Sequence, residues 1–111
     1  MTEAEVLFNQ ITQLIPDGKP GKMFGALCIK TPNGKAAAMF WKEALIVKLH
    51  GDIFDEAMSL DGSQLFEPME GRPMKKWVQI PYNYQEQWLM FAEEAAKQVR
   101  AIEVIKPVKK K

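Results

Sequence analysis

The sequence has few of the residues that cross-link a fold, bind metals or carry acid–base catalysis. Its 111 residues include one cysteine, Cys28, and one histidine, His50. A single cysteine forms no internal disulfide and builds no cysteine-rich zinc site, which favours a reducing compartment. A single histidine excludes multi-histidine metal sites and paired-histidine mechanisms. We therefore expect no metal and no cofactor.

Long apolar runs and a strong net charge are also absent. No stretch approaches the ~20 apolar residues that cross a bilayer. The N-terminal segment MTEAEVLFNQ carries two Glu and no Lys or Arg, unlike a secretory signal or a transit peptide. Fifteen Lys plus Arg against fourteen Asp plus Glu leave a formal net charge of +1, too little to grip nucleic acid through bulk charge. The sequence predicts a cytoplasmic protein without a membrane span.

What is present favours one domain and a charged tail. The chain has an ordinary domain length, and its 47% apolar residues can supply a core. Residues 1–105 hold 11 basic and 14 acidic side chains, and residues 106–111 then add four lysines. We expect a single domain over residues 1–105 and a basic, flexible tail over residues 106–111. The tail is either a solvated terminus or an electrostatic tether for an anionic partner.

Hydrophobic periodicity predicts three helices. Apolar residues recur at three- and four-residue steps over residues 4–15, where Thr2 and Glu5 make a capping box. A short amphipathic segment follows Gly51, and a long final helix is expected to be capped by Asn83. The apolar seam of that last helix consists of Tyr84, Trp88, Phe91, Ala95, Val99 and Ile102.

Turn signals predict five strands. Asn33-Gly34 is a strong hairpin signal, and Lys42-Glu43 marks a second tight turn. Residues 19–21 (Lys-Pro-Gly) and the Pro- and Gly-rich residues 67–76 are expected to be loops. The expected strands cover residues 23–30, 35–41, 44–49, 64–66 and 77–80.

The order of these elements predicts the fold class. Strands joined by short turns form antiparallel sheets, and amphipathic helices pack on a face of such a sheet. The expected fold is an α+β two-layer sandwich of the order α-β3-α-β2-α. Its five-stranded antiparallel sheet would carry the helices on one face.

Three segments carry a family resemblance: KMFG at residues 22–25, FEPMEGRPM at residues 66–74 and WVQIP at residues 77–81. They resemble the N-terminal domain of the TfoX (Sxy) competence regulators, and the likeness extends from about residue 22 to the last helix. The resemblance implies a secretion-chaperone-like fold and a link to transcriptional or competence regulation. Regulators of this family also carry a second, helical domain, for which this sequence has no room. The resemblance implies no catalytic residues.

The predicted loop at residues 71–77 gathers the residue types that bind phosphates and bases. Arg72, Lys75 and Lys76 place three cations before Trp77. Cations beside an aromatic side chain can hold phosphates while a base stacks. The structural alternative is that Arg72 pairs with a glutamate and that the Gly and Pro residues shape the loop.

The predicted sheet has large apolar side chains on both faces. Met39 and Trp41 share a face of their strand, and Trp77 is expected to join them on the side that the helices leave bare. An uncovered patch of this kind is an association surface. We therefore expect a homodimer or an unidentified protein partner at Met39, Trp41 and Trp77.

No constellation in the sequence indicates catalysis. His50 is interpreted as a strand-end residue and Cys28 as a small apolar residue of a strand. The leading hypothesis is a non-catalytic protein-interaction module. The alternatives are a weak nucleic-acid-binding protein that uses Arg72, Lys75, Lys76 and the tail, and then a small enzyme or ligand-binding protein.

Overall fold

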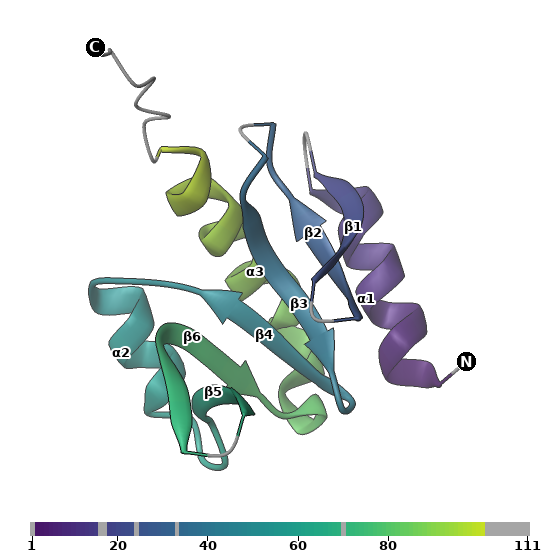
Figure 1. Cartoon of the computed structure of the whole chain (residues 1–111). Helices are drawn as coiled ribbons and strands as arrows, with labels where there is room; N and C mark the ends of the chain where they lie inside the picture. The colour runs from purple at the N-terminus through teal and green to yellow at the C-terminus, as the bar shows by residue number, and fades with distance from the viewer. Residues whose placement is uncertain (1, 16–17, 24, 33, 70, 102–111) are drawn as a thin grey trace, which may run out of the picture.

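A single antiparallel sheet of six strands, in the order β1-β2-β3-β4-β6-β5, forms the centre of the protein (Figure 1). The computed structural model describes residues 2–15, 18–23, 25–32, 34–69 and 71–101. In chain order the elements are α1 (Glu3–Leu14), β1 (Lys19–Met23), β2 (Ala26–Lys30), β3 (Ala36–Trp41), β4 (Ala44–Lys48), α2 (Asp52–Met58), β5 (Gln64–Met69), β6 (Arg72–Ile80), the 3-10 turn η1 (Tyr82–Tyr84) and α3 (Gln85–Arg100). No helix of these described ranges has the length and apolarity to cross a membrane.

The predicted α+β class and the antiparallel sheet are confirmed, whereas the predicted number of strands is wrong. Residues 19–21 belong to β1, which pairs with β2, and the expected strand over residues 23–30 is interrupted before Ala26. Gly25 has φ +76°, a left-handed conformation that lets the chain reverse at this point. Pro20 is tolerated because β1 is an edge strand and needs no amide donor on its outer side.

The helix termini confirm one of the two predicted N-caps and contradict the other. The Thr2 hydroxyl accepts a hydrogen bond from the Glu5 amide at 3.2 Å, which confirms the predicted N-cap of α1. The expected Asn83 cap is wrong, since α3 begins at Gln85 after η1 and has no side-chain cap. There the Trp88 indole N–H instead donates to the Pro81 carbonyl oxygen at 3.1 Å and ties the first turn of α3 to the end of β6.

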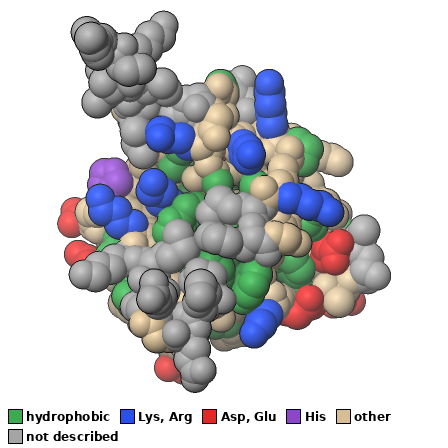
Figure 2. All heavy atoms as spheres, viewed as in Figure 1, with side chains coloured by type: hydrophobic (Ala, Val, Ile, Leu, Met, Phe, Trp, Pro, Cys, Tyr) green, Lys and Arg blue, Asp and Glu red, His purple; other side chains and the backbone are tan. Residues whose placement is uncertain are grey.

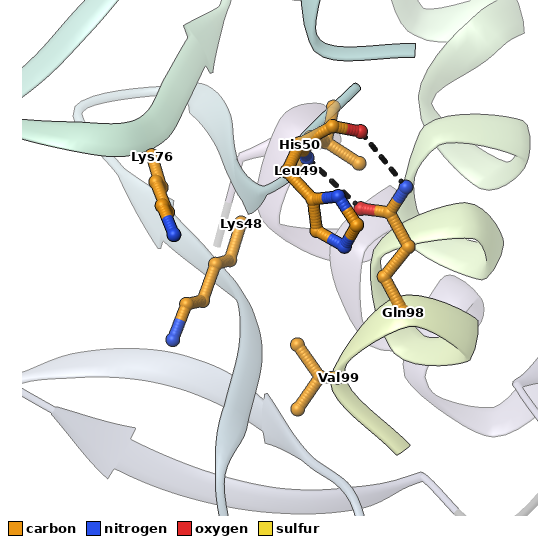
Figure 3. Close-up of a pocket in the computed structure, with 6 residues that line it drawn as sticks. All are labelled: Lys48, Leu49, His50, Lys76, Gln98 and Val99. Atoms are coloured by element: carbon orange, nitrogen blue, oxygen red, sulfur yellow. Dashed lines mark hydrogen bonds between the residues drawn. The ribbon is translucent and has the colours of Figure 1, made fainter. Parts of the chain in front are cut away.

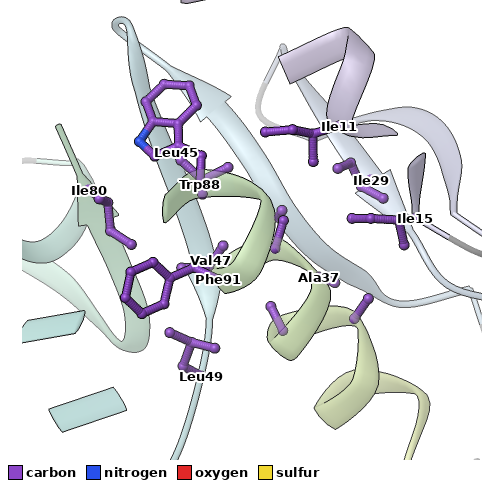
Figure 4. Close-up of a cluster of buried hydrophobic side chains, with 14 of the residues drawn as sticks. Ile11, Ile15, Ile29, Ala37, Leu45, Val47, Leu49, Ile80, Trp88 and Phe91 are labelled. Atoms are coloured by element: carbon purple, nitrogen blue, oxygen red, sulfur yellow. The ribbon is translucent and has the colours of Figure 1, made fainter. Parts of the chain in front are cut away.

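The main core lies between the sheet and the helices (Figure 4). Leu45 and Val47 of β4 and Leu49, the residue after this strand, face this side, as the alternation in the sequence predicts. Val78 and Ile80 of β6 join them. All three helices contribute buried residues to this one cluster. Its largest fully buried side chains include Phe8, Ile11, Trp88 and Phe91. The helices therefore cover one face of the sheet, as expected.

The opposite face of the sheet is not bare, which corrects the second part of that expectation. A second buried cluster lies there and contains no helical residue; its members are Cys28, Met39, Ala44, Ile46, Phe66 and Trp77. The β5–β6 hairpin supplies its outer side, and Phe66 packs edge-on against Trp41 with ring centroids 5.5 Å apart. In the register, Leu65 pairs with Val78 but Phe66 pairs with Met74, so β6 carries three extra residues there. A bulge of this kind bends a hairpin.

The turn between β3 and β4 stores backbone strain. Lys42 has φ +48° and Glu43 has φ +65°, and Trp41 and Ala44 pair on either side of them. Two-residue hairpin turns with both central residues at positive φ favour Asn and Gly, because a Cβ is disfavoured in this conformation. Lys42 holds its ammonium 5.9 Å from the centre of the Trp41 ring.

Replacement of Glu43 by glycine should relieve part of this strain. We expect Glu43→Gly to raise the free energy of unfolding by about 1 kcal/mol. Glu43→Gln is the matched control, since it removes the same charge and keeps a Cβ. Urea denaturation of the two variants measures the difference; equal stabilities would contradict the strained turn.

Candidate anion-binding site

The two layers of the fold carry opposite charge. The strands contain seven Lys or Arg residues and one Glu. The helices contain eight Asp or Glu residues and two Lys or Arg residues. A formal net charge of +1 for the whole chain conceals this separation. In the view of Figure 2, from the helix-free side of the sheet, blue Lys and Arg side chains gather over the upper half and red Asp and Glu side chains lie toward the margins.

Four lysines form what we call the basic surface. Lys19, Lys30 and Lys48 lie on this side, and Lys76, which is opposite Leu49 and next to Trp77, reaches the cleft from the helix-covered side. A Cβ placed on Gly21 would meet the Lys30 side chain at 3.1 Å and the Cys28 sulfur at 3.4 Å, so Lys30 and Cys28 lie on the same side of the sheet. Lys19 is the register partner of Lys30.

The other two lysines lie toward the opposite end of the sheet. Lys48 follows Ala44 and Ile46 by alternation along β4, and these two residues belong to the helix-free cluster. Lys76 lies beside Lys48, because the Leu49 amide donates to the Lys76 carbonyl oxygen at 2.9 Å and both lysines line one cleft.

These lysines form two like-charged pairs that no acidic side chain of the described residues compensates. Lys19 and Lys30 are directly opposite each other on β1 and β2, and Lys48 and Lys76 flank one cleft. Among the described residues, none of the four ammonium groups has a hydrogen-bond or ion-pair partner. Like charges opposite each other in a sheet are destabilising. An anion held between them would remove that cost.

The cleft beside Lys48 and Lys76 lies between the end of β4 and the last turn of α3. It has a volume of about 360 Å³, and its lining residues are Lys48, Leu49, His50, Lys76, Gln98 and Val99 (Figure 3). Leu49 and Val99 are buried and form an apolar floor. A second hollow of about 270 Å³ shares three of these residues, Leu49, His50 and Lys76, and adds Gly51, Phe54 and Asp55. The described residues that line the cleft have cationic or neutral side chains, and Asp55 lines the second hollow.

Gln98 holds the chain at His50 as a neighbouring strand would. Its side-chain oxygen accepts from the His50 amide at 3.0 Å, and its side-chain NH₂ donates to the His50 carbonyl oxygen at 3.0 Å. Both backbone groups of His50 are thus satisfied after β4 has ended. The imidazole stays exposed at the rim of the cleft (Figure 3).

The structure separates the predicted site residues. Lys76 is exposed and lines the cleft, whereas Trp77 is 7% exposed and Met39 is fully buried in the second cluster. The expected exposed patch of Met39, Trp41 and Trp77 is therefore wrong, because the bent β5–β6 hairpin covers it; Trp41 is half-buried. The side chains of Arg72 and Lys75 lie outside the described part of the structure, as does the tail over residues 106–111.

Sequence reasoning missed the cleft because its residues come from three separate elements. Lys48 and His50 share a face of their strand, which alternation alone indicates. Gln98 is 48 residues away from His50, and no pattern in the sequence joins them. Lys76 was expected in a loop rather than beside β4.

The one cysteine is unsuited to nucleophilic chemistry. Cys28 is 1% exposed. Burial raises the pKa of its thiol, and the nearby Lys30 ammonium lowers this pKa by less. Reactive cysteines have the reverse combination of exposure and lowered pKa. Among the described residues, no group of three His, Cys, Asp or Glu side chains is placed to hold a metal ion.

Comparisons with known proteins add no functional assignment: no family model matches the chain, and neither a curated protein nor a solved structure is significantly similar to it.

The burial of Trp77 predicts a large stability effect. We expect Trp77→Ala to lower the free energy of unfolding by about 3–5 kcal/mol, because it leaves a cavity under the β5–β6 hairpin. Trp41→Ala, at a half-buried position, should cost clearly less. Urea denaturation of both variants measures the effect. If the Trp77 ring were exposed, Trp77→Ala would change the free energy of unfolding by less than about 0.5 kcal/mol.

The raised pKa of Cys28 predicts a pH dependence at alkaline pH. The folded thiol binds its proton more tightly than the unfolded one, so its contribution to stability is full below about pH 8.5 and is lost as the pH rises further. We expect the unfolding free energy of the wild type to fall more steeply above this pH than that of Cys28→Ala. Denaturation of both proteins from neutral to alkaline pH tests this, and parallel curves would contradict it.

Proposed function

We propose that this protein is a non-catalytic interaction module that binds an acidic protein surface through its basic surface. The observation that carries the proposal is that two pairs of lysines, Lys19 with Lys30 and Lys48 with Lys76, have no ion-pair partner among the described residues. Complementary potentials favour encounter with partners of opposite charge. Carboxylates placed between these pairs would replace repulsion with attraction.

A protein partner is favoured over nucleic acid by what surrounds these lysines. Base stacking needs an accessible aromatic ring, and Trp77, the aromatic residue next to Lys76, is buried. Readout of a duplex groove commonly uses a helix, and the helices here are acidic and lie on the other side of the sheet. Nucleic-acid binding through phosphate contacts alone is the second candidate, because the strands carry an excess of cations.

The resemblance to the TfoX N-terminal domain, which implies no catalytic residues, supports the proposal of a non-catalytic interaction module. We propose the secretion-chaperone-like arrangement as the fold type, with the additional strand β1 at its edge, and a role in transcriptional regulation inside the cell. The buried, high-pKa thiol of Cys28 agrees with a module that performs no nucleophilic chemistry. The lysines of residues 106–111 follow α3 in the sequence and would add charge to the same interaction.

Binding to a fluorescent poly-glutamate peptide, measured by anisotropy, tests the proposal. We expect each double variant of the basic surface, Lys19→Gln/Lys30→Gln and Lys48→Gln/Lys76→Gln, to weaken binding by about tenfold, as expected for lost charge-assisted contacts. Binding should also weaken with added salt.

The matched control is Lys22→Gln/Lys97→Gln, which removes two charges elsewhere. Lys22 pairs with Leu27, whose side chain packs toward the helices, and Lys97 is exposed on α3. Equal loss in this control would overturn the basic surface as the site. Tighter binding of a mixed-sequence DNA duplex than of the peptide, at the same salt concentration, would favour the second candidate.

A further inference from the structure

We infer that the cleft between the end of β4 and the last turn of α3 binds a phosphomonoester, the terminal phosphate of a small metabolite or nucleotide. The inference concerns a small ligand at one end of the basic surface and goes beyond the macromolecular partner proposed above. It rests on the side chains that line this cleft, on the lack of counter-ions to them in the described part of the structure, and on the hydrogen bonds that hold the cleft wall.

Three basic side chains from two strands and the segment after β4 surround the cleft. Lys48 and Lys76 place their ammonium groups on one side, and the His50 imidazole lies across from them beside Gln98 (Figure 3). Lysine ammonium and imidazole N–H groups can donate hydrogen bonds to phosphate oxygens. Among the described residues, no carboxylate lines this cleft; Asp55 of α2 lines the neighbouring hollow.

The lysines are available to a ligand because nothing in the described structure occupies them. Neither Lys48 nor Lys76 has a hydrogen-bond or ion-pair partner there. Both side chains line the cleft, and two positive charges repel each other. A dianion removes this repulsion and gains two charge-assisted hydrogen bonds at once.

The wall of the cleft is held in position before a ligand arrives. Gln98 bonds both the amide and the carbonyl of His50, so the segment that carries the imidazole is fixed to α3. Leu49 and Val99, which are 0% and 1% exposed, close the floor. An apolar floor excludes water and strengthens the attraction between an anion and the surrounding cations. Such preorganisation lowers the entropic cost of binding.

The size of the cleft favours a small ligand. A volume of about 360 Å³ is at the lower end of the range for small-molecule sites. Three donors suit the three terminal oxygens of a phosphomonoester better than the two oxygens of a carboxylate. The adjoining hollow of about 270 Å³, lined in part by Phe54, offers room for the remainder of an esterified ligand.

Calorimetric titration of the full chain with inorganic phosphate, at constant ionic strength set by chloride, tests the site. We expect saturable binding with one equivalent, and about a tenfold loss of affinity in Lys48→Gln/Lys76→Gln. The matched control is Lys19→Gln/Lys30→Gln, the other lysine pair, which should change phosphate affinity less than about twofold. The His50 and Gly51 amides should shift in nuclear magnetic resonance spectra of the wild type on addition of phosphate.

Two further ligands distinguish the sources of the phosphate. If adenosine monophosphate binds more tightly than both glycerol phosphate and inorganic phosphate, the ligand is a nucleotide. Equal affinities for the three ligands mean that the phosphate alone is recognised, and either result supports the site. The phosphate site would be overturned if titration with chloride gave the same binding heat as titration with phosphate. It would also be overturned if the two lysine double variants weakened phosphate binding equally.

The outcomes also separate this inference from the proposed function. If phosphate binding depends on Lys48 and Lys76 but poly-glutamate does not bind, the phosphate site is supported and the acidic protein partner is overturned. Poly-glutamate binding that both lysine pairs support, without saturable phosphate binding, would do the reverse. The circular dichroism spectrum and thermal midpoint of each variant in chloride buffer verify that the fold is retained.

Discussion

The structure depends on the need to cover a sheet that is apolar on both of its faces. Strand β4 has four consecutive buried residues, Ala44 to Val47, so alternation places large apolar groups on either side. Helices supply the cover for one face and a bent hairpin supplies it for the other. An uncovered face of this composition would expose a patch of the kind that aggregates or associates. The bulge in β6 accompanies the contact of Phe66 with Trp41, and this hairpin covers the second apolar face.

The way each face is covered also decides where charge can lie. Helices carry their own outward-facing surface, and here that surface is acidic. Phe66 and Trp77 of the hairpin belong to the buried cluster on the other face, whereas Lys19 is exposed and Lys30 and Lys48 are partly exposed at strand ends. Three lysines of the basic surface, Lys19, Lys30 and Lys48, lie at strand ends, and Lys76 lies in the bulge of β6. A nearly neutral chain thus presents two surfaces of opposite sign.

Local patterns in the sequence were sufficient for much of the fold. The spacing of apolar residues predicts α1 and the buried face of α3, and the alternation in residues 44–49 predicts which side chains of β4 meet the helices. Asn83 failed as a cap because the chain enters α3 through η1, where Trp88 bonds to Pro81 instead. The residues of β1 resembled a loop because Pro and Gly weaken strand propensity, and an edge position tolerates both.

By itself the sequence determined the class of the fold and the two-sided apolar character of the sheet, because both follow from short-range periodicity. Only the tertiary structure decided that Met39 and Trp77 are buried, since their cover comes from Phe66 on another strand. The same holds for the cleft, where Gln98 of α3 meets His50 across 48 residues of chain. Contacts between distant segments depend on how the layers pack, and a linear pattern does not record that.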